Sequence, residues 1–278
     1  METSVLSRTR KPAGNTATTW LKIIALVFMF IDHAGKMCFP TVPEMRIIGR
    51  IAFPIYAWCM IVGFHYTRSV PKYLLRILIT GIVSQPLYNL ALHHEVEIGA
   101  HFANLFQSFS LPALTSFLQA MVKKPNIFLT LFLGLCALWG IREKKFLSQI
   151  WAPVVTLILA TVLGADYGWQ GVLLFIMLYA VQESRPGIAA VMVSYFLFWG
   201  SSYSITKSLF GLPIDLGSLP AFLSLPLSAF MRMETYALFS LPFILIRFKK
   251  DLKLPRWVGY ALYPAHLAAL YALEQLMK

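Results

Sequence analysis

Nine stretches of this chain are apolar over roughly the length of a helix that crosses a bilayer, and this pattern restricts the fold most. A transmembrane helix needs about 17–25 predominantly apolar residues. The stretches lie at about 20–40, 46–66, 73–92, 126–141, 147–164, 168–182, 187–204, 235–247 and 257–277. Pro and Ser interrupt two further apolar segments, 99–122 and 208–231, which favours re-entrant or interfacial positions. The pattern predicts an all-α, polytopic integral membrane bundle of about nine transmembrane helices, within a range of about nine to eleven.

The composition excludes several classes of protein. Hydrophobic residues make up 58% of the 278 positions, and charged residues make up only 13%. A soluble domain carries about 25% charged residues, so a soluble enzyme, a disordered chain and a nucleic-acid-binding domain all match poorly. The three cysteines form no CxxC pair and no metal-binding spacing, so we expect neither a disulfide framework nor a metal site.

The net charge of +12 fits membrane orientation better than nucleic-acid binding. With nine helices and a cytoplasmic N-terminus, sixteen Lys and Arg residues fall on the inner side and eight on the outer side. Cytoplasmic loops of membrane proteins carry such an excess of positive residues. We therefore expect residues 1–19 to form a basic cytoplasmic segment and residues 20–278 to form a single transmembrane domain.

Two adjacent ionisable residues, Asp32 and His33, fall in the outer half of the first predicted helix. They lie about 15 Å further along the axis than Lys22, which is close enough to the inner end to reach the membrane surface. A charge at the bilayer centre costs about 2.5–3.5 kcal/mol, so such residues indicate either a functional site or a structural pair. Arg50 falls at a similar depth in the second helix, where two roles are open: pairing with Asp32, or binding an anionic group.

Arg68, Lys72 and Arg76 cluster at the inner ends of the second and third predicted helices. The cluster is typical either of ordinary positive-inside charge or of a site for phosphate groups. The outer loop also holds His93, His94 and His101, but their spacing matches no recognised metal site.

Further polar residues fall toward the outer side. Asp166 and Tyr167 belong to a tight turn between two predicted helices, where Asp166 is able to act as a helix cap. Arg232 and Glu234 open the eighth predicted helix, and their charges are close enough to pair. His266 falls near the middle of the last helix, where a histidine indicates either a functional group or a hydrogen-bonded structural one.

Six segments together resemble the TraX family, which is named for the protein that N-acetylates pilin in F-type conjugation. They are LKIIALVFMFIDHAG at 21–35, IGRIAFPIYAWCMIVGF at 48–64, KYLLRILITGIVSQPLY at 72–88, GADYGWQGVLL at 164–174, RMETYAL at 232–238 and YPAHLAALYAL at 263–273. The resemblance covers most of the chain, from about Trp20 to about Tyr271, and the stretch 99–125 resembles an insertion. TraX is similar in turn to a wider group of transmembrane acyltransferases, which share a basic residue eleven positions before a histidine in the first helix. Lys22 and His33 have this spacing.

The resemblance implies a bacterial inner-membrane acetyltransferase that takes acetyl-CoA from the cytoplasm, uses no metal, and acetylates an amine or hydroxyl at the outer side. His33 is then expected to be the general base. Asp32 and Arg50 are expected to assist it, with Arg50 stabilising the oxyanion. The expected ligands of the cofactor phosphates are Lys22, Arg68, Lys72 and Arg76, and the expected secondary or substrate residues are Asp166, Tyr167, Arg232, Glu234 and His266.

Two other classes stay open on the sequence. A transporter or proton-coupled carrier would use Asp32, His33 and His266 as a proton relay, and it predicts internal repeats, of which the sequence shows none. A non-enzymatic scaffold for pilus or envelope assembly would need neither His33 nor a cofactor site. For an enzyme, the acceptor is open between a protein N-terminus, a glycan and a lipid, and the oligomeric state is also open.

Overall fold

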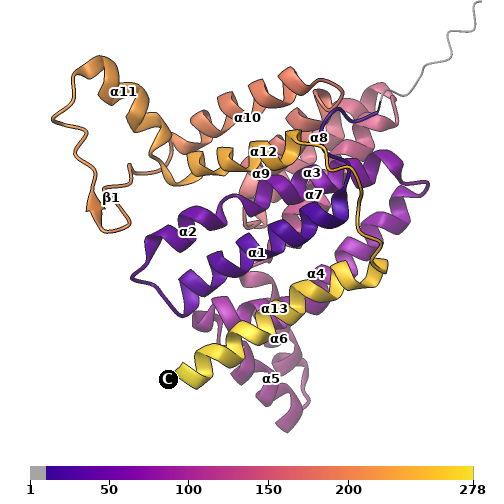
Figure 1. Ribbon diagram of the computed structural model, residues 1–278. Helices are drawn as coiled ribbons and strands as arrows, with labels where there is room; N and C mark the ends of the chain where they lie inside the picture. The colour runs from indigo at the N-terminus through magenta and orange to yellow at the C-terminus, as the bar shows by residue number, and fades with distance from the viewer. Residues whose placement is uncertain (1–10, 278) are drawn as a thin grey trace, which may run out of the picture.

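The structure, a computed structural model, describes residues 11–277, and 74% of the protein is helical. Residues 1–10 of the predicted N-terminal segment lie outside the described residues. The α-helices are α1 (Thr18–Met37), α2 (Pro43–Gly49), α3 (Ala52–Tyr66), α4 (Val70–Leu92), α5 (Ile98–Gln107), α6 (Leu111–Lys123), α7 (Ile127–Arg142), α8 (Phe146–Val162), α9 (Gly168–Ala180), α10 (Arg185–Gly200), α11 (Ala221–Phe230), α12 (Leu241–Leu245) and α13 (Arg256–Met277) (Figure 1). Two 3₁₀ helices, η1 (His94–Val96) and η2 (Met233–Ser240), and an antiparallel hairpin, β1 (Ser208–Leu209) with β2 (Leu212–Pro213), complete the described elements.

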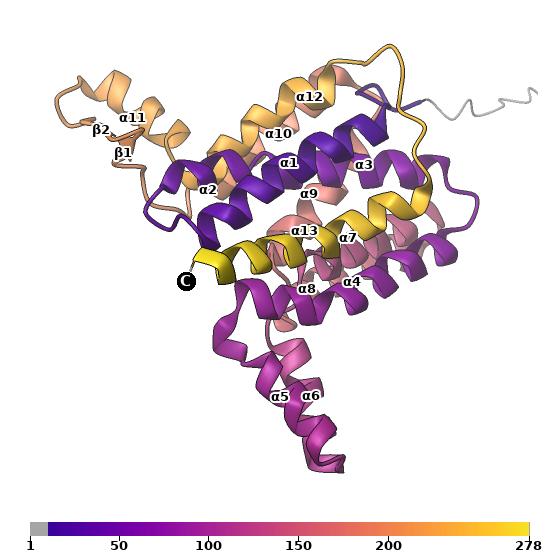
Figure 2. The same cartoon turned by 60° about the horizontal axis from the view of Figure 1, so that its bottom comes forward.

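The core forms around α3, a helix with apolar residues on every side. A helix of this kind is buried rather than amphipathic. Phe53, Trp58 and Phe64 are each no more than 2% exposed. Helix α1 packs along α3, and α13 packs against both α4 and α1 (Figures 1 and 2). The first and last helices of the chain are therefore neighbours.

The N-terminal end of α1 is tied to the segment before α13. The Asp251 carboxylate accepts hydrogen bonds from the backbone N–H groups of Thr19 and Trp20. The first N–H groups of a helix have no partner within the helix, and an acidic side chain there also meets the positive end of the helix dipole. Upstream of α1, Asn15 is fully buried, and its carbonyl accepts from the indole N–H of Trp58 at 2.7 Å.

Three candidate membrane spans are long and apolar enough to cross a bilayer: Thr18–Met37, Pro43–Tyr66 and Val70–Leu92. The count rises to four if Leu111–Lys123 and Ile127–Arg142, which are bent by 71° at their junction, form one span. Four further apolar segments in the described part of the chain have only 10–17 residues, fewer than the ~20 that a bilayer requires. The expectation of a helical chain is thus confirmed, and the three or four candidate spans support a membrane protein, while the predicted total of nine spans is not confirmed.

The predicted span at 235–247 has a different local structure. Its first part is the 3₁₀ helix η2, and only the short α12 follows it, ending at Leu245. Pro242 at the start of α12 lacks an N–H group, so it cannot continue the hydrogen-bond ladder from η2. The tighter turn places Glu234 and Thr235 at buried positions.

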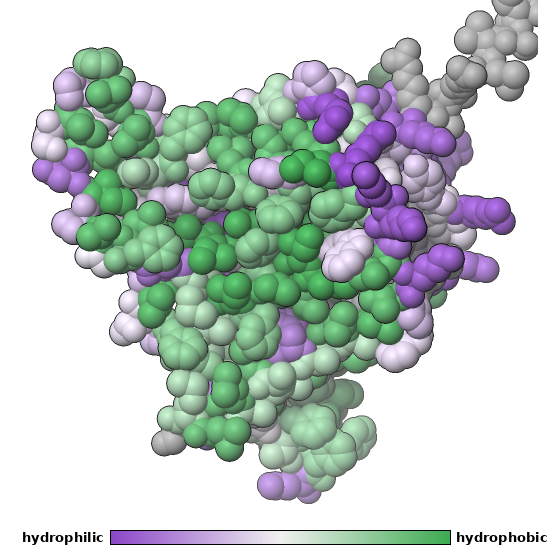
Figure 3. Space-filling model, viewed as in Figure 1, coloured by the Kyte–Doolittle hydropathy of each residue, from purple (hydrophilic) through white to green (hydrophobic). Residues whose placement is uncertain are grey.

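Two segments project from the helical body (Figure 2). One is the α5–α6 hairpin, and the other is the arm of β1, β2 and α11; they correspond to the expected re-entrant or interfacial segments 99–122 and 208–231. The face seen in Figure 3 is largely hydrophobic over the body. Hydrophilic residues gather at the right of that view, where the α3–α4 connection and the segment before α13 lie. Exposed basic residues of these segments are Arg68, Lys72, Lys249, Lys250 and Lys253.

Candidate functional site

A cavity of about 340 Å³ lies among α1, α2, α3, η2 and the turn before α9, at the end of α1 away from the basic segments. Asp32 and His33 enter it from α1, Arg50 from the junction of α2 and α3, Asp166 from the turn, and Glu234 from η2. The structure therefore brings together residues that the sequence indicated separately at a similar depth. Because they come from distant parts of the chain, only the packed fold assembles them.

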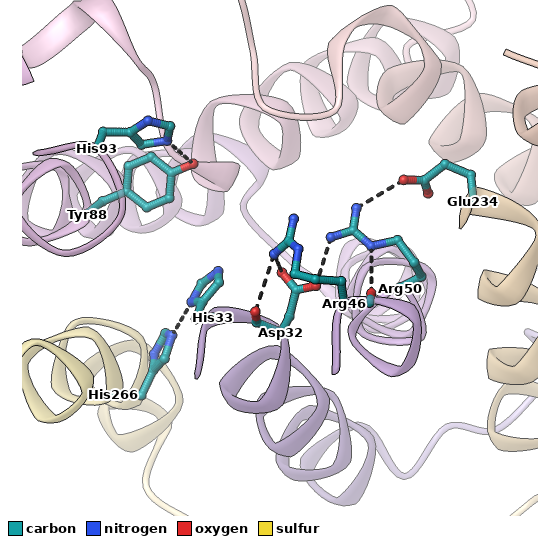
Figure 4. Close-up of polar contacts among 8 residues, drawn as sticks. All are labelled: Asp32, His33, Arg46, Arg50, Tyr88, His93, Glu234 and His266. Carbon is teal, nitrogen blue, oxygen red and sulfur yellow. Dashed lines mark hydrogen bonds and ion pairs between the residues drawn. The ribbon is translucent and has the colours of Figure 1, made fainter. Parts of the chain in front are cut away.

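His33 and His266 form a hydrogen-bonded pair across α1 and α13 (Figure 4). Nδ1 of His33 lies 3.0 Å from Nε2 of His266, and Nδ1 of His266 lies 3.3 Å from the carbonyl oxygen of Leu262. A carbonyl only accepts, so in the neutral rings Nδ1 of His266 carries the proton and its Nε2 accepts from Nδ1–H of His33. This assignment leaves Nε2 of His33 unprotonated, and no side chain among residues 11–277 bonds to it.

Asp32 lies between two guanidinium groups rather than against its neighbour His33 (Figure 4). Nη2 of Arg50 donates to one carboxylate oxygen at 2.8 Å, and Nη1 of Arg46 donates to the other. Arg50 also donates from Nη1 to Glu234 at 3.0 Å. Asp32 is 8% exposed and Glu234 is 2% exposed. Buried charges of this kind are stable only when they are paired, so the network joins α1, α2 and η2.

Gly49 allows α2 to approach α1 closely enough for these ion pairs. A Cβ atom at this position would overlap the Asp32 carboxylate, which glycine avoids. Arg46 and Arg50 are four residues apart and therefore lie on the same side of the turn, so both reach Asp32. In the sequence, Arg46 is only one of the eight positive charges on the predicted outer side and is not among the expected site residues; its spacing of four from Arg50 is the signal that identifies it.

An aromatic wall closes another side of the cavity. Tyr167 stacks on Phe53 with ring centroids 3.9 Å apart, and Trp199 meets both rings edge-on. Asp166 precedes Tyr167 in the turn between α8 and α9. Desolvation by the surrounding protein raises the pKa of Asp166 from its ordinary value, and the positive charge of Arg50 opposes that rise.

The four residues that were expected to bind cofactor phosphates lie away from the cavity. Arg68, Lys72 and Arg76 are exposed around the α3–α4 connection, and Lys22 lies near the start of α1. None of the four lines the cavity. Lys22 is about 15 Å along the helix axis from Asp32, so this basic set and the cavity lie toward opposite ends of α1.

Arg232 and Glu234 do not pair with each other. Arg232 donates through Nη1 to the carbonyl oxygens of Ser201 and Tyr203, whereas Glu234 binds Arg50. Arg232 is absent from the cavity lining. It therefore fastens the arm that follows α10 to the start of η2.

The three histidines of the predicted outer loop bind other side chains. His93 contacts Glu95 at 2.9 Å, His94 contacts Glu274 at 3.3 Å, and His101 contacts the Ser116 hydroxyl at 3.0 Å. Within residues 11–277, no group of three or more His, Cys, Asp and Glu side chains is arranged to hold a metal ion.

These features define a class of protein: a helical membrane protein with a polar, charge-paired cavity toward one end of its first helix. The chain belongs to the TraX protein family, because the family model matches residues 17–274, and this confirms the resemblance seen in the sequence.

Two relatives add to this comparison. Over 182 residues the chain is 28% identical to the probable fimbrial assembly protein FimC, serogroup H1, of Dichelobacter nodosus, covering 64% of this chain and 66% of that protein. Over 173 residues it is 27% identical to the uncharacterized protein RP591 of Rickettsia prowazekii (strain Madrid E), covering 60% of this chain and 57% of that protein. The chain thus spans less than two-thirds of the length of either relative. No solved structure matches it.

Proposed function

We propose that this protein is an integral membrane acetyltransferase, which moves an acetyl group from cytoplasmic acetyl-CoA to an amine or hydroxyl at the outer side of the bacterial inner membrane. The observation that carries the proposal is the His33 imidazole, which lines a polar cavity with Nε2 unprotonated and Nδ1 bonded to His266. A neutral imidazole is suited to act as a general base near neutral pH. Membership of the TraX family supports acetyl transfer as the chemistry.

In the proposed reaction, the acceptor nitrogen or oxygen attacks the thioester carbon while Nε2 of His33 removes its proton. His266 stabilises the resulting imidazolium, since its Nε2 accepts the hydrogen bond from Nδ1–H of His33. The C–S bond then breaks, and the CoA thiolate takes the proton back from His33. Arg50 has a second N–H on each Nη atom beyond its bonds to Asp32 and Glu234, and we expect one of these groups to donate to the developing oxyanion.

Acetyl-CoA would then extend along α1 between two sites. Its phosphates would bind the basic set near the cytoplasmic end, Lys22, Arg68, Lys72 and Arg76, because charge-assisted hydrogen bonds from Lys and Arg hold phosphate groups. Its acetyl end would reach the cavity beside His33. This arrangement assigns the basic end of the bundle to the cytoplasm, as the positive-inside rule favours.

Three classes of acceptor fit this chemistry, and a pilus subunit is favoured among them. The relative named as a probable fimbrial assembly protein favours a pilus subunit, whose amino terminus would be the amine. A glycan or a lipid at the outer surface is also compatible with general-base chemistry. In each case we expect Asp166 and Tyr167 to contact the acceptor, since both line the cavity.

Acetyl-CoA binding by the purified full-length protein in detergent tests the proposed function. An acetyltransferase must bind this donor, whereas a proton-coupled carrier or an assembly scaffold has no need of it. Saturable binding supports the enzyme, and its absence contradicts it.

The double variant Lys72→Gln, Arg76→Gln is expected to weaken CoA binding at least tenfold. Each substitution removes a charge-assisted bond worth about 1.5–3 kcal/mol, and about 1.4 kcal/mol corresponds to a factor of ten. Isothermal titration in detergent measures the change. The matched control is Lys249→Gln, Lys250→Gln, which removes two exposed positive charges outside the expected phosphate site. Equal CoA affinity in both variants would contradict phosphate binding by Lys72 and Arg76 and would favour the alternative, in which they only set the membrane orientation.

A further inference from the structure

Tyr263 has a buried hydroxyl group with no hydrogen-bond partner among the described residues. The side chain is 5% exposed and lines the cavity. A buried polar atom without a partner costs free energy, and native structures rarely keep one without a reason. Ser84, Gln182 and Tyr236 also have such an atom, but none of these three lines the cavity.

The position of the Tyr263 ring is determined by its neighbours. It lies three residues before His266 on α13, and residues at this spacing share a helix face. The ring meets the His266 imidazole edge-on with centroids 5.2 Å apart, and it meets Phe128 edge-on at 4.8 Å. The ring is therefore a fixed part of the cavity lining, and it carries a buried, unpartnered hydroxyl on a residue next to His266, the partner of His33.

The Tyr263 hydroxyl differs in its existing bonds from Arg50, the expected oxyanion donor. Arg50 is already bound to Asp32 and Glu234, and these carboxylates neutralise much of its charge. The Tyr263 hydroxyl carries no such bond, so its buried O–H is unsatisfied within the fold and can donate to an oxygen atom of a ligand that packs against it.

We propose that Tyr263 is a catalytic residue whose hydroxyl donates a hydrogen bond to the thioester carbonyl oxygen of acetyl-CoA; this inference rests on the proposed function. When the acceptor attacks the carbonyl carbon, the C=O electron pair moves onto the oxygen, and the acceptor proton moves to Nε2 of His33. The Tyr263 O–H stabilises the oxyanion without giving up its proton. The C=O bond re-forms as the C–S bond breaks, and the thiolate leaves with the proton from His33. The products are acetylated acceptor and CoA thiol.

The variant Tyr263→Phe removes only the hydroxyl and keeps the packed ring. We expect kcat for acetyl transfer to fall about 100-fold or more, the effect of losing one oxyanion donor. The dissociation constant for acetyl-CoA should stay within about twofold, because the hydrogen bond strengthens mainly in the transition state. The assay uses the full-length protein in detergent, labelled acetyl-CoA as donor and an envelope extract as the source of acceptor.

Tyr236→Phe is the matched control, since it removes another buried hydroxyl without a partner in the described residues, from a side chain outside the cavity. It is expected to transfer acetyl at the wild-type rate. If wild-type protein transfers acetyl and Tyr263→Phe matches it in kcat, the assignment of Tyr263 is wrong while the proposed function stands. If wild-type protein transfers no acetyl, the proposed function itself fails, and this inference fails with it.

Discussion

His33→Ala is expected to lower acetyl transfer by about 100-fold or more while acetyl-CoA binding persists. Loss of a general base has an effect on this scale. The substitution also removes the bond to His266, which would then keep an unpaired Nε2, so folding is checked first by size-exclusion chromatography. Transfer of labelled acetyl to envelope components measures the effect.

His65→Ala is the control for this experiment. His65 is a partly buried histidine at the C-terminal end of α3, whereas the cavity lies at the N-terminal end of this helix, and His65 does not line it. It is expected to retain transfer. His266→Ala is expected to have a smaller effect than His33→Ala, since His266 acts by orienting His33 and not on the substrate. Near-normal acetyl transfer by folded His33→Ala protein would contradict the role of His33 as the base and would leave His266 as the candidate base.

Arg50→Met is expected to be the most destabilising of these substitutions, by about 3–5 kcal/mol. Arg50 is the partner of two buried carboxylates, so its removal leaves Glu234 without an ion pair and Asp32 with Arg46 alone. Unpaired buried charge causes the loss, which is measured as a lower midpoint of thermal unfolding in detergent.

Two further variants test whether unpaired buried charge causes the loss of stability in Arg50→Met. Arg68→Met removes an exposed arginine and should change stability by no more than about 0.5 kcal/mol. Adding Glu234→Gln to Arg50→Met removes the uncompensated carboxylate and should restore part of the lost stability. Equal midpoints for Arg50→Met and Arg68→Met would contradict the proposed role of the ion-pair network.

Depth along the predicted helices was the most informative property of the sequence. The rise per residue is regular, so counting from Lys22 and from the start of the second helix placed Asp32, His33 and Arg50 at one level. The structure shows the Asp32–Arg50 pair, which was one of the two roles left open for Arg50. Polar groups at membrane depth need partners, and this requirement makes such a pair predictable.

Contacts between distant segments could not be derived in the same way. Depth alone does not say which helices are neighbours, so the approach of α13 to α1, and with it the His33–His266 bond, appears only in the fold. The unpartnered hydroxyl of Tyr263 depends on the same packing. Apolar length does not distinguish a span from a shorter buried helix or from the 3₁₀ helix η2, which explains why the predicted nine spans exceed the three or four candidates in the described residues.

Mass spectrometry of envelope components from cells with and without the protein tests the central claim most directly. The cells are fed an isotopically labelled acetyl source, and those lacking the protein are complemented with either the wild-type or the His33→Ala chain. The proposed function predicts a component that gains the mass of one labelled acetyl group with wild-type protein and lacks it with His33→Ala. Identical masses of all envelope components in cells lacking the protein and in cells complemented with the wild-type chain would contradict it.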